Sequence, residues 1–378
     1  MNKKIVFLSG TRADFGKQKP IITEAIKNID FSVTIFTTGM HMLSKYGYTF
    51  EEVKQNFPNF VYGFVNQNHK SHLDEILSKT VLGFSDYVRE IGPDLIVVHG
   101  DRVEALAGSI VGSLNHILVA HIEGGEISGT IDDSIRHAIS KFSHIHFVSN
   151  NISKNRLMSM GELSSSIFEI GSPDFDVMSS NNLPTVREAL AHYEIPFQDY
   201  SILLFHPVTS ELKSLEHDTR EIVEAVIESE RNFIVIHPNN DPGTEIIQKA
   251  YKEIYNSEKF RFFPSIRFEF FLTLLKNADL IIGNSSAGIR EAPFFGVPTI
   301  NIGTRQFGRS ANLDIANVLP EKKKILSALN KIGGKESIRK SNEFGFDPRQ
   351  SSSDKFMEVL RNPEIWKIDV QKIFNESS

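Results

Sequence analysis

Residues 94–122 read DLIVVHGDRVEALAGSIVGSLNHILVAHI and give the first indication of the fold class. An apolar run from Asp94 to His99 is followed by an amphipathic segment from Val103 to Leu114 and a second apolar run from Ile117 to Ile122. Short, continuous runs rich in Val and Ile are typical of strands buried on both faces of a parallel sheet. The stretch therefore predicts a strand, a crossover helix and a second, parallel strand.

The same alternation continues along the chain in both directions. Further strand candidates before residue 172 lie at 5–8, 32–37, 144–148 and 167–170, with helix candidates at 18–27, 73–90 and 133–142. After Gly171-Ser172-Pro173 the rhythm restarts, with strand candidates at 201–205, 232–236, 261–263, 280–282 and 299–302.

This rhythm predicts an α/β protein with two doubly wound, Rossmann-like domains, residues 1–172 and 173–350. A last helical stretch at 354–361 and a tail with Trp366 should pack as a segment of their own, residues 351–378. Open α/β domains bind ligands at the carboxyl ends of their strands, so facing domains would hold a ligand in the crevice between them.

Composition excludes several classes of protein. The chain has 378 residues, with 41 Lys and Arg against 47 Asp and Glu for a net charge of −6, which disfavours a nucleic-acid-binding surface driven by basic charge. It has no cysteine, which removes disulfides, cysteine–zinc sites, iron–sulfur clusters and cysteine nucleophiles. No run approaches the ~18 apolar residues that span a bilayer, and the first apolar run is too short for a secretion signal. We therefore expect a cytoplasmic protein without a nucleic-acid or membrane partner.

The first strand candidate ends in a turn of small residues, SGTRADFGK. Backbone N–H groups at a helix start, with Arg12 and Lys17, can hold a phosphate; the alternative is a strand-to-helix turn with solvated charges. The turn is not a P-loop, because five residues separate Gly10 from Gly16 and Gln18 replaces the Ser or Thr that binds magnesium. No G-x-G-x-x-G follows a strand, which disfavours a dinucleotide-dependent dehydrogenase.

Three neighbouring segments of the first domain carry acids where strands end or helices begin. Asp101 follows the strand ending at His99, Glu123 follows the next strand, and Asp132 opens the helix after it. Carboxylates at adjacent strand ends can converge on one cleft and serve as general acids and bases. Each also has a structural alternative: Asp132 as a helix cap, and Asp101 paired with Arg102.

The second domain presents polar residues at equivalent places. His206 follows its first strand and Asn240 lies after its second. The stretch GNSSAGIREAP, from Gly283, lies between a strand and a helix; its serines can bind an anion, and its glutamate, Glu291, can accept both hydroxyls of a ribose. The alternative is a serine cap with a glutamate in the first turn.

In combination, these motifs resemble one family, the hydrolysing UDP-N-acetylglucosamine 2-epimerases of sialic acid synthesis. The resemblance runs from about residue 4 to 309 and rests on GTRADFGK, TGMHM, HGDR, HIEGGE, TIDDSIRH, FHPVTSE, NNDPGTE, SIRFEFF, GNSSAGIREAPFFG and GTRQ. It implies a fold similar to GT-B glycosyltransferases, with two Rossmann-like domains, the nucleotide sugar in a central cleft and a C-terminal helix returning to the first domain. The implied reaction converts UDP-N-acetylglucosamine and water to N-acetylmannosamine and UDP, without cofactor or metal.

The resemblance also implies roles for individual residues. Asp101, Glu123 and Asp132 match the catalytic acids, and Arg136 and His206 match further active-site residues. We expect Glu123 or Asp101 to remove the C2 proton and Asp132 to serve the hydration step. The positions that match UDP-binding residues are Arg12, Arg102, His206, Asn240, Ser285, Ser286, Glu291 and Arg305, with Ser285 and Ser286 at the diphosphate and Glu291 at the ribose. Additional cleft candidates are Lys17, Ser265 and Arg267.

Ala13-Asp14 and TIDDSIRH favour the hydrolysing branch, because the non-hydrolysing enzymes carry a proline–glutamate turn and lack this form of the second motif. Three alternatives remain open: the same chemistry on UDP- or GDP-linked N,N'-diacetylbacillosamine, a GT-B glycosyltransferase, and a non-catalytic nucleotide-sugar sensor. The resemblance further implies a homodimer or homotetramer.

Overall fold

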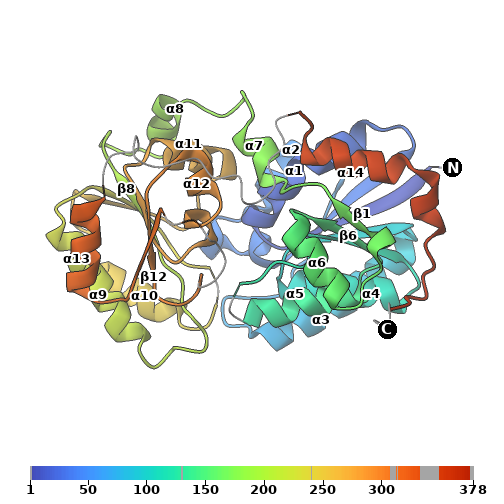
Figure 1. Ribbon diagram of the computed structural model, residues 1–378, viewed down its shortest axis with the longest axis horizontal. Coiled ribbons are helices and arrows are strands. Elements are labelled where there is room, and N and C mark those ends of the chain that lie inside the picture. The colour runs from blue at the N-terminus through green and yellow to red at the C-terminus, as the bar shows by residue number, and fades with distance from the viewer. Residues whose placement is uncertain are drawn as a thin grey trace. The chain divides into compact units, whose positions relative to one another are not determined.

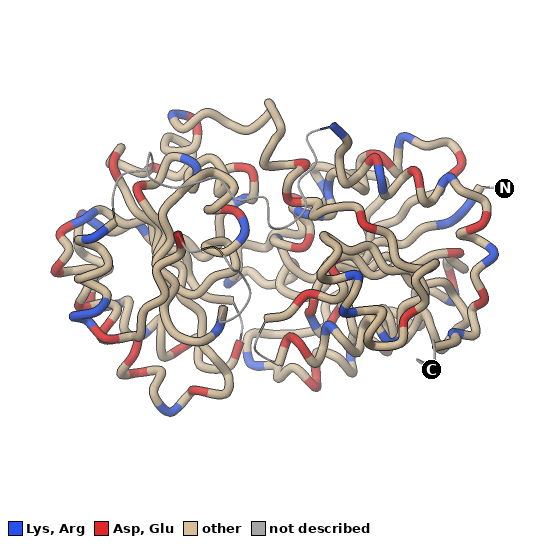
Figure 2. Tube along the Cα trace, in the orientation of Figure 1, with Lys and Arg blue, Asp and Glu red and all other residues tan. Residues whose placement is uncertain are grey.

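The computed structural model describes residues 2–128, 131–239, 241–306, 312, 314–332 and 349–374. The chain forms two compact units (Figure 1). Unit 1 comprises Met1–Ile127, Asp132–Ser179 and Phe344–Ser378, and unit 2 comprises Ser128–Ile131 and Ser180–Glu343. Acidic and basic residues are interspersed along both units (Figure 2).

The described residues of unit 1 form a seven-stranded parallel sheet in the order β3-β2-β1-β4-β5-β6-β7. The strands are β1 (Lys3–Ser9), β2 (Phe31–Thr37), β3 (Val61–Gly63), β4 (Leu95–His99), β5 (Leu118–Ile122), β6 (Ile145–Val148) and β7 (Ile167–Glu169). The order reverses between β1 and β4, which is the switch point where open α/β sheets bind ligands.

Helices cover both faces of this sheet because alternate residues of each strand point to opposite faces. Ile5 and Phe7 belong to a core shared with α1 (Arg12–Lys27) and α14 (Ser352–Arg361). Val6 and Leu8 belong to a second core with α3 (Leu73–Ile91) and α4 (Val103–Leu114). The remaining α-helices of this unit are α2 (Phe50–Asn56), α5 (Ile131–Phe142), α6 (Asn151–Ser159) and α7 (Asp174–Met178).

Unit 2 has a six-stranded parallel sheet in the order β10-β9-β8-β11-β12-β13. Its strands are β8 (Ser201–Leu204), β9 (Phe233–Ile236), β10 (Phe260–Phe263), β11 (Ile281–Gly283), β12 (Thr299–Ile302) and β13 (Ile315–Val318). Its α-helices are α8 (Val186–His192), α9 (Leu215–Glu228), α10 (Thr244–Tyr251), α11 (Phe268–Asn277), α12 (Glu291–Phe295) and α13 (Lys322–Lys331). One large core joins the strands to α9, α10 and α13.

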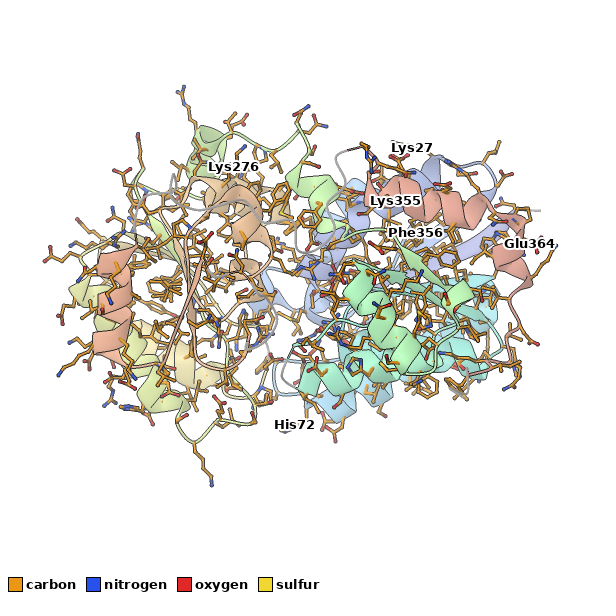
Figure 3. The ribbon with its side chains drawn as sticks, in the orientation of Figure 1. Lys27, His72, Lys276, Lys355, Phe356 and Glu364 are labelled. Carbon is orange, nitrogen blue, oxygen red and sulfur yellow. The ribbon has the colours of Figure 1, made fainter. Side chains whose placement is uncertain are left out.

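The C-terminal helix α14 lies beside α1 in unit 1 (Figure 1). Its Phe356, labelled in Figure 3, is fully buried and contacts the rings of Phe7 and Phe147. Asp176 of α7 accepts hydrogen bonds from the backbone N–H groups of Ser352 and Ser353 at the start of α14. The predicted fold class, two doubly wound domains with a helix that returns to the first, is confirmed.

The tail after α14 is held by a buried carboxylate, Glu162. Its Oε2 lies 2.6 Å from Lys372 Nζ and 3.0 Å from His146 Nε2, and its Oε1 lies 3.2 Å from Lys141 Nζ. Lys372 also donates to the backbone carbonyl groups of Ser140 and Lys141. Because unpaired buried charges are costly, these contacts fix the tail to unit 1.

Three details differ from the sequence-based predictions. β3 and β13 were not predicted, since their residues are only partly apolar and partly exposed. α1 begins at Arg12 rather than at residue 18, because Thr11 Oγ1 accepts from Asp14 N as an N-terminal cap and the helix accommodates Pro20. The chain passes to unit 2 at Ser180, whereas a boundary at residue 172 was predicted; α7 packs against α1 and α14 and so lies with unit 1.

Among the described residues, no helix combines the length and apolarity that crossing a membrane requires.

The Glu162 contacts predict a pH-dependent contribution to stability. Burial alone would raise the pKa of Glu162, but the hydrogen bonds and charges of His146 and Lys372 outweigh burial and lower the pKa to about 2. Since the folded-state pKa is the lower one, the contribution is complete above pH ~4.5 and is lost as the pH falls towards 2. We expect Glu162→Gln to reduce the free energy of unfolding by ~3 kcal/mol at pH 7, measured by urea denaturation.

The matched control is Glu364→Gln, whose carboxylate pairs with Lys367 on the surface and is 68% exposed. This change should cost less than ~0.5 kcal/mol. The difference in the free energy of unfolding between Glu162→Gln and the unmodified chain should become smaller as the pH is lowered from 5 towards 3. A difference that is independent of pH would contradict the assignment.

Candidate active site

Glu123 is the most constrained of the candidate acids in unit 1. It follows β5 directly, has a backbone φ of 63°, and its side chain is only 4% exposed. Non-glycine residues rarely adopt this left-handed conformation, and such positions concentrate at functional sites. The backbone N–H of Glu123 donates to Phe147 O, and its carbonyl group accepts from Arg136 Nη1 at 2.8 Å.

Both carboxylate oxygens of Glu123 face donors. Ser172 Oγ donates to Oε1 at 2.7 Å. Oε2 lies 3.3 Å from His99 Nε2 and 3.6 Å from Lys17 Nζ. Burial disfavours a charged carboxylate, whereas nearby cations and donors favour it. The burial of the Glu123 carboxylate is therefore accompanied by donors on both of its oxygens.

Asp101 and Arg136 form an ion pair next to Glu123. Arg136 Nη2 donates to Asp101 Oδ2, while Nη1 of the same guanidinium holds the Glu123 backbone. Arg136 is buried, and the Asp101 side chain is 24% exposed. The structure thus brings together Asp101, Glu123, Arg136 and Lys17.

Asp132 lies one turn before Arg136 on α5 and is half-buried. Residues four apart share a helix face, so α5 presents Asp132 and Arg136 on the same side. Asp132 belongs to the first turn of this helix.

The cations of the first domain have separate partners. Arg12 Nε lies 2.8 Å from Glu52 Oε2 of α2, and both side chains are largely buried. Arg102 is the N-terminal cap residue of α4 and is half-buried. Lys17 Nζ lies 3.1 Å from Asp174 Oδ2 of α7 in addition to Glu123.

In unit 2, Asn284 organises the carboxyl edge of the sheet. Its side chain accepts from His206 N at 2.7 Å and donates to His206 O at 2.8 Å, which ties the loop after β8 to the loop after β11. Its backbone carbonyl group accepts from Arg305 Nη1 and Gln306 Nε2. Asn284 therefore joins two of the predicted UDP-binding residues, His206 and Arg305.

The approach of β11 to β8 requires glycine at position 283. Gly283 has a φ of 137°, and a Cβ there would collide with the carbonyl oxygen of Leu204. The next residue after Asn284, Ser285, is the N-terminal cap of a short 3-10 helix, Ser286–Gly288, and its Oγ accepts from Ala287 N. Ser285 thus caps a helix, as the alternative from the sequence suggested. Ser286, the next residue, is half-buried at the same edge of the sheet.

The remaining candidates of unit 2 lie on neighbouring elements. His206 Nδ1 accepts from Asn239 N at 3.4 Å. Glu291 begins α12 and is buried. Ser265 and Arg267 lie between β10 and α11; Arg267 N donates to Tyr193 Oη, and its guanidinium lies over the ring of Phe270. Asn240 lies outside the described residues.

Sequence reasoning did not single out Asp14, His99, Ser172, Asp174 or Asn284. His99 and Asn284 each occupy a strand end, which was the available signal, but their partners come from distant segments. Glu126, in the same loop as Glu123, is also buried and accepts from Ser149 Oγ at 2.8 Å. Within the described ranges, no group of three or more His, Asp or Glu residues is arranged to hold a metal ion.

Comparisons with known proteins identify the family of this chain. The family model described as UDP-N-acetylglucosamine 2-epimerase matches residues 24–361. A UDP-N-acetylglucosamine 2-epimerase of Neisseria meningitidis serogroup B is 45% identical over 98% of this chain and 98% of the relative. A UDP-N,N'-diacetylbacillosamine 2-epimerase (hydrolyzing) of Legionella pneumophila is 32% identical over 91% of this chain and 93% of the relative.

Among solved structures, the Methanocaldococcus jannaschii UDP-GlcNAc 2-epimerase in complex with UDP-GlcNAc and UDP has a TM-score of 0.78 at 25% identity. The match covers 94% of this chain and 99% of that chain. The chain described here therefore belongs to the UDP-N-acetylglucosamine 2-epimerase family.

Proposed function

We propose that this chain is a hydrolysing UDP-N-acetylglucosamine 2-epimerase that converts UDP-N-acetylglucosamine and water to N-acetylmannosamine and UDP. The observation that carries the proposal is the group of Glu123, Asp101 and Arg136 at the carboxyl edge of the unit 1 sheet. Its ion pairs and buried carboxylate fit a reaction that moves protons beside a developing negative charge. The 45% identity to the Neisseria enzyme over nearly the whole chain supports the same reaction.

The reaction has two halves. In the first, the C2–H bond breaks and its proton passes to a carboxylate, the electron pair forms a C1=C2 double bond, and the C1–O bond breaks with its electrons leaving on UDP. The product is 2-acetamidoglucal. In the second half, the hydroxyl group of water adds to C1. A proton adds to C2 on the face opposite to the one from which the first proton was removed, which gives N-acetylmannosamine.

We assign proton removal to Glu123 or Asp101, and the hydration half to Asp132. A base must lie within hydrogen-bond reach of the proton it takes, and Asp101 and Glu123 are linked through one guanidinium. Arg136 fixes both acids at once. Asp132 shares a face of α5 with Arg136, and this supports its assignment to the hydration step.

We assign UDP binding to the polar edge of unit 2. Ser285 and Ser286 would donate to the diphosphate and Glu291 would accept the ribose hydroxyls. His206 and Arg305, both held by Asn284, would add donors for the charge that develops on UDP. From the family resemblance, we also assign UDP binding to Asn240 of unit 2 and to Arg12 and Arg102 of unit 1. Lys17 of unit 1 and Ser265 and Arg267 of unit 2 are further candidates.

The second candidate is the same chemistry on UDP- or GDP-linked N,N'-diacetylbacillosamine, favoured by the 32% identity to the Legionella enzyme. We further propose that the chain acts in the cytoplasm, in the first step of sialic acid synthesis for a capsule polysaccharide, as a homodimer or homotetramer. A cysteine-free sequence suits a reducing compartment.

Turnover in deuterated water tests the proposed function. The chain is incubated with UDP-N-acetylglucosamine and followed by proton NMR. We expect UDP and N-acetylmannosamine with deuterium at C2, because the proton that returns to C2 comes from solvent. No turnover would overturn the assignment, and turnover of the diacetylbacillosamine nucleotides alone would select the second candidate. Exchange without release of UDP would indicate a non-hydrolysing enzyme.

Ser286→Ala tests the diphosphate site in unit 2. We expect UDP affinity, measured by isothermal titration calorimetry, to fall about tenfold, since a hydrogen bond to a charged group contributes roughly 1.5–3 kcal/mol. Ser214→Ala, at an exposed residue of the same unit, is the control and should bind UDP normally. Equal affinity of both variants would place the diphosphate elsewhere.

A further inference from the structure

In unit 1, the side chains of Asp14, His99 and Glu123 face one another in a row. His99, the last residue of β4, lies between two carboxylates from different elements. Its Nδ1 is 3.5 Å from Asp14 Oδ1 on α1, and its Nε2 is 3.3 Å from Glu123 Oε2 after β5. The side chains of His99 and Glu123 are each 4% exposed, and that of Asp14 is 14% exposed.

Both ring nitrogens of His99 therefore face acceptors. An ionised carboxylate only accepts hydrogen bonds, and a neutral imidazole has one N–H, so only the imidazolium form can donate to both. The two contacts are ion-pair distances and do not meet the geometric criteria of a hydrogen bond, so the carboxylates face the His99 ring as charged neighbours on both sides. The geometry thus favours a proton on each nitrogen.

The next histidine along the sheet shows the opposite arrangement. His121, on β5, places Nε2 2.8 Å from the carbonyl oxygen of Gly100 and Nδ1 3.0 Å from Ser140 Oγ. A carbonyl group and a hydroxyl group satisfy a neutral ring, and burial lowers the pKa of His121 to about 3. For His99, burial alone would also lower the pKa, but the carboxylates of Glu123 and Asp14 outweigh it and raise the pKa to about 9.

Other titratable and charged groups face this row of side chains: His41 and Glu104 interact electrostatically with Asp14, and His121 interacts with His99. Lys17, on α1 like Asp14, contacts Glu123 and also Asp174 of α7, and its charge opposes that of His99. Arg136 of α5 holds the Glu123 backbone, and Ser172 donates to the other carboxylate oxygen. The Glu123 carboxylate is thus held at Oε1 by Ser172 and at Oε2 by Lys17 and His99.

We propose that His99 and Asp14 are positioning residues for the reaction: His99 orients the Glu123 carboxylate through Oε2, and Asp14 holds His99 in the imidazolium form that can do so. The inference rests on the proposed function, because it assigns the pair a role in the step that uses Glu123. Neither residue touches the substrate. Their effect passes through Glu123.

The proposal has a definite pH dependence. As the pH rises through the pKa of His99, the ring loses one of its two protons and its positive charge, so the Glu123 carboxylate loses this charged partner. Activity that depends on this arrangement should then decline on the alkaline side. Replacing Asp14 by Asn removes one of the two charges that support the imidazolium, and an opposite charge at this distance shifts a pKa by ~1 unit. The alkaline limb of kcat/KM should move to lower pH by the same amount.

The test combines NMR of the full chain labelled with ¹⁵N-histidine and the pH profile of kcat/KM. The His99 signal is identified by its loss in His99→Gln. We expect both ring nitrogens of His99 to be protonated at pH 7.5, and Asp14→Asn to lower its pKa and the alkaline limb together by ~1 unit, with kcat changed more than KM. Asp86→Asn, at an exposed ion pair on α3, is the control and should change neither.

A neutral His99 at pH 7.5, or an unchanged His99 pKa in Asp14→Asn, would overturn the proposal. So would a shifted pKa with an unshifted pH profile. The NMR measurement does not require turnover, so it distinguishes the two proposals. If the wild-type chain is inactive but His99 is protonated and its pKa depends on Asp14, the proposed function and the role of His99 in catalysis are refuted. The pairing of His99 with Asp14 would still stand. Asp14→Asn keeps the test available if His99→Gln does not fold.

Discussion

A buried carboxylate must be compensated, and in unit 1 this requirement organises the residues around Glu123. Groups from five parts of the chain meet its carboxyl and backbone atoms: Lys17 of α1, His99 of β4, Arg136 of α5, Phe147 of β6 and Ser172 before α7. Each is supported in turn, Lys17 by Asp174, His99 by Asp14 and Arg136 by Asp101. Removing any one member would leave a charge or donor uncompensated at low exposure. The candidate site is therefore a coupled set of charges.

The parallel sheet makes this set possible. Strands β1, β4 and β5 are neighbours, so the residues that follow them emerge at one edge. In unit 2, the loops after β8 and β11 likewise lie at one edge of the sheet, and the uncharged side chain of Asn284 joins them through hydrogen bonds. The two edges differ in chemistry: unit 1 gathers several acids with compensating cations, and unit 2 gathers amides, hydroxyls and a histidine together with Arg305 and Glu291. This division suits a reaction in which one part of the substrate exchanges protons and another leaves as an anion.

The sequence predicted the regular parts of this structure because buried parallel strands produce continuous apolar runs. It did not predict β3 and β13, which are short and partly exposed, nor the first turns of α1, where Thr11 caps a helix that contains Pro20. Asp101, Glu123 and Arg136 could be selected as candidates in advance, by strand ends and by family resemblance. Lys17, a further partner of Glu123, was also a candidate. The roles of His99, Ser172 and Asp14 could not be predicted, because these residues are far apart in the chain and their pairing depends on tertiary placement.

The account's central claim is that this set of charges drives elimination across C1 and C2 of the sugar, with cleavage of the C1–O bond. Turnover of UDP-N-acetylglucosamine in ¹⁸O-enriched water tests this most directly, with the UDP product analysed by ³¹P NMR for isotope-shifted phosphate signals. The account predicts UDP without ¹⁸O, because its terminal oxygen is the one that leaves C1. Incorporation of ¹⁸O into the terminal phosphate of UDP would show that water attacks phosphorus and would contradict the account.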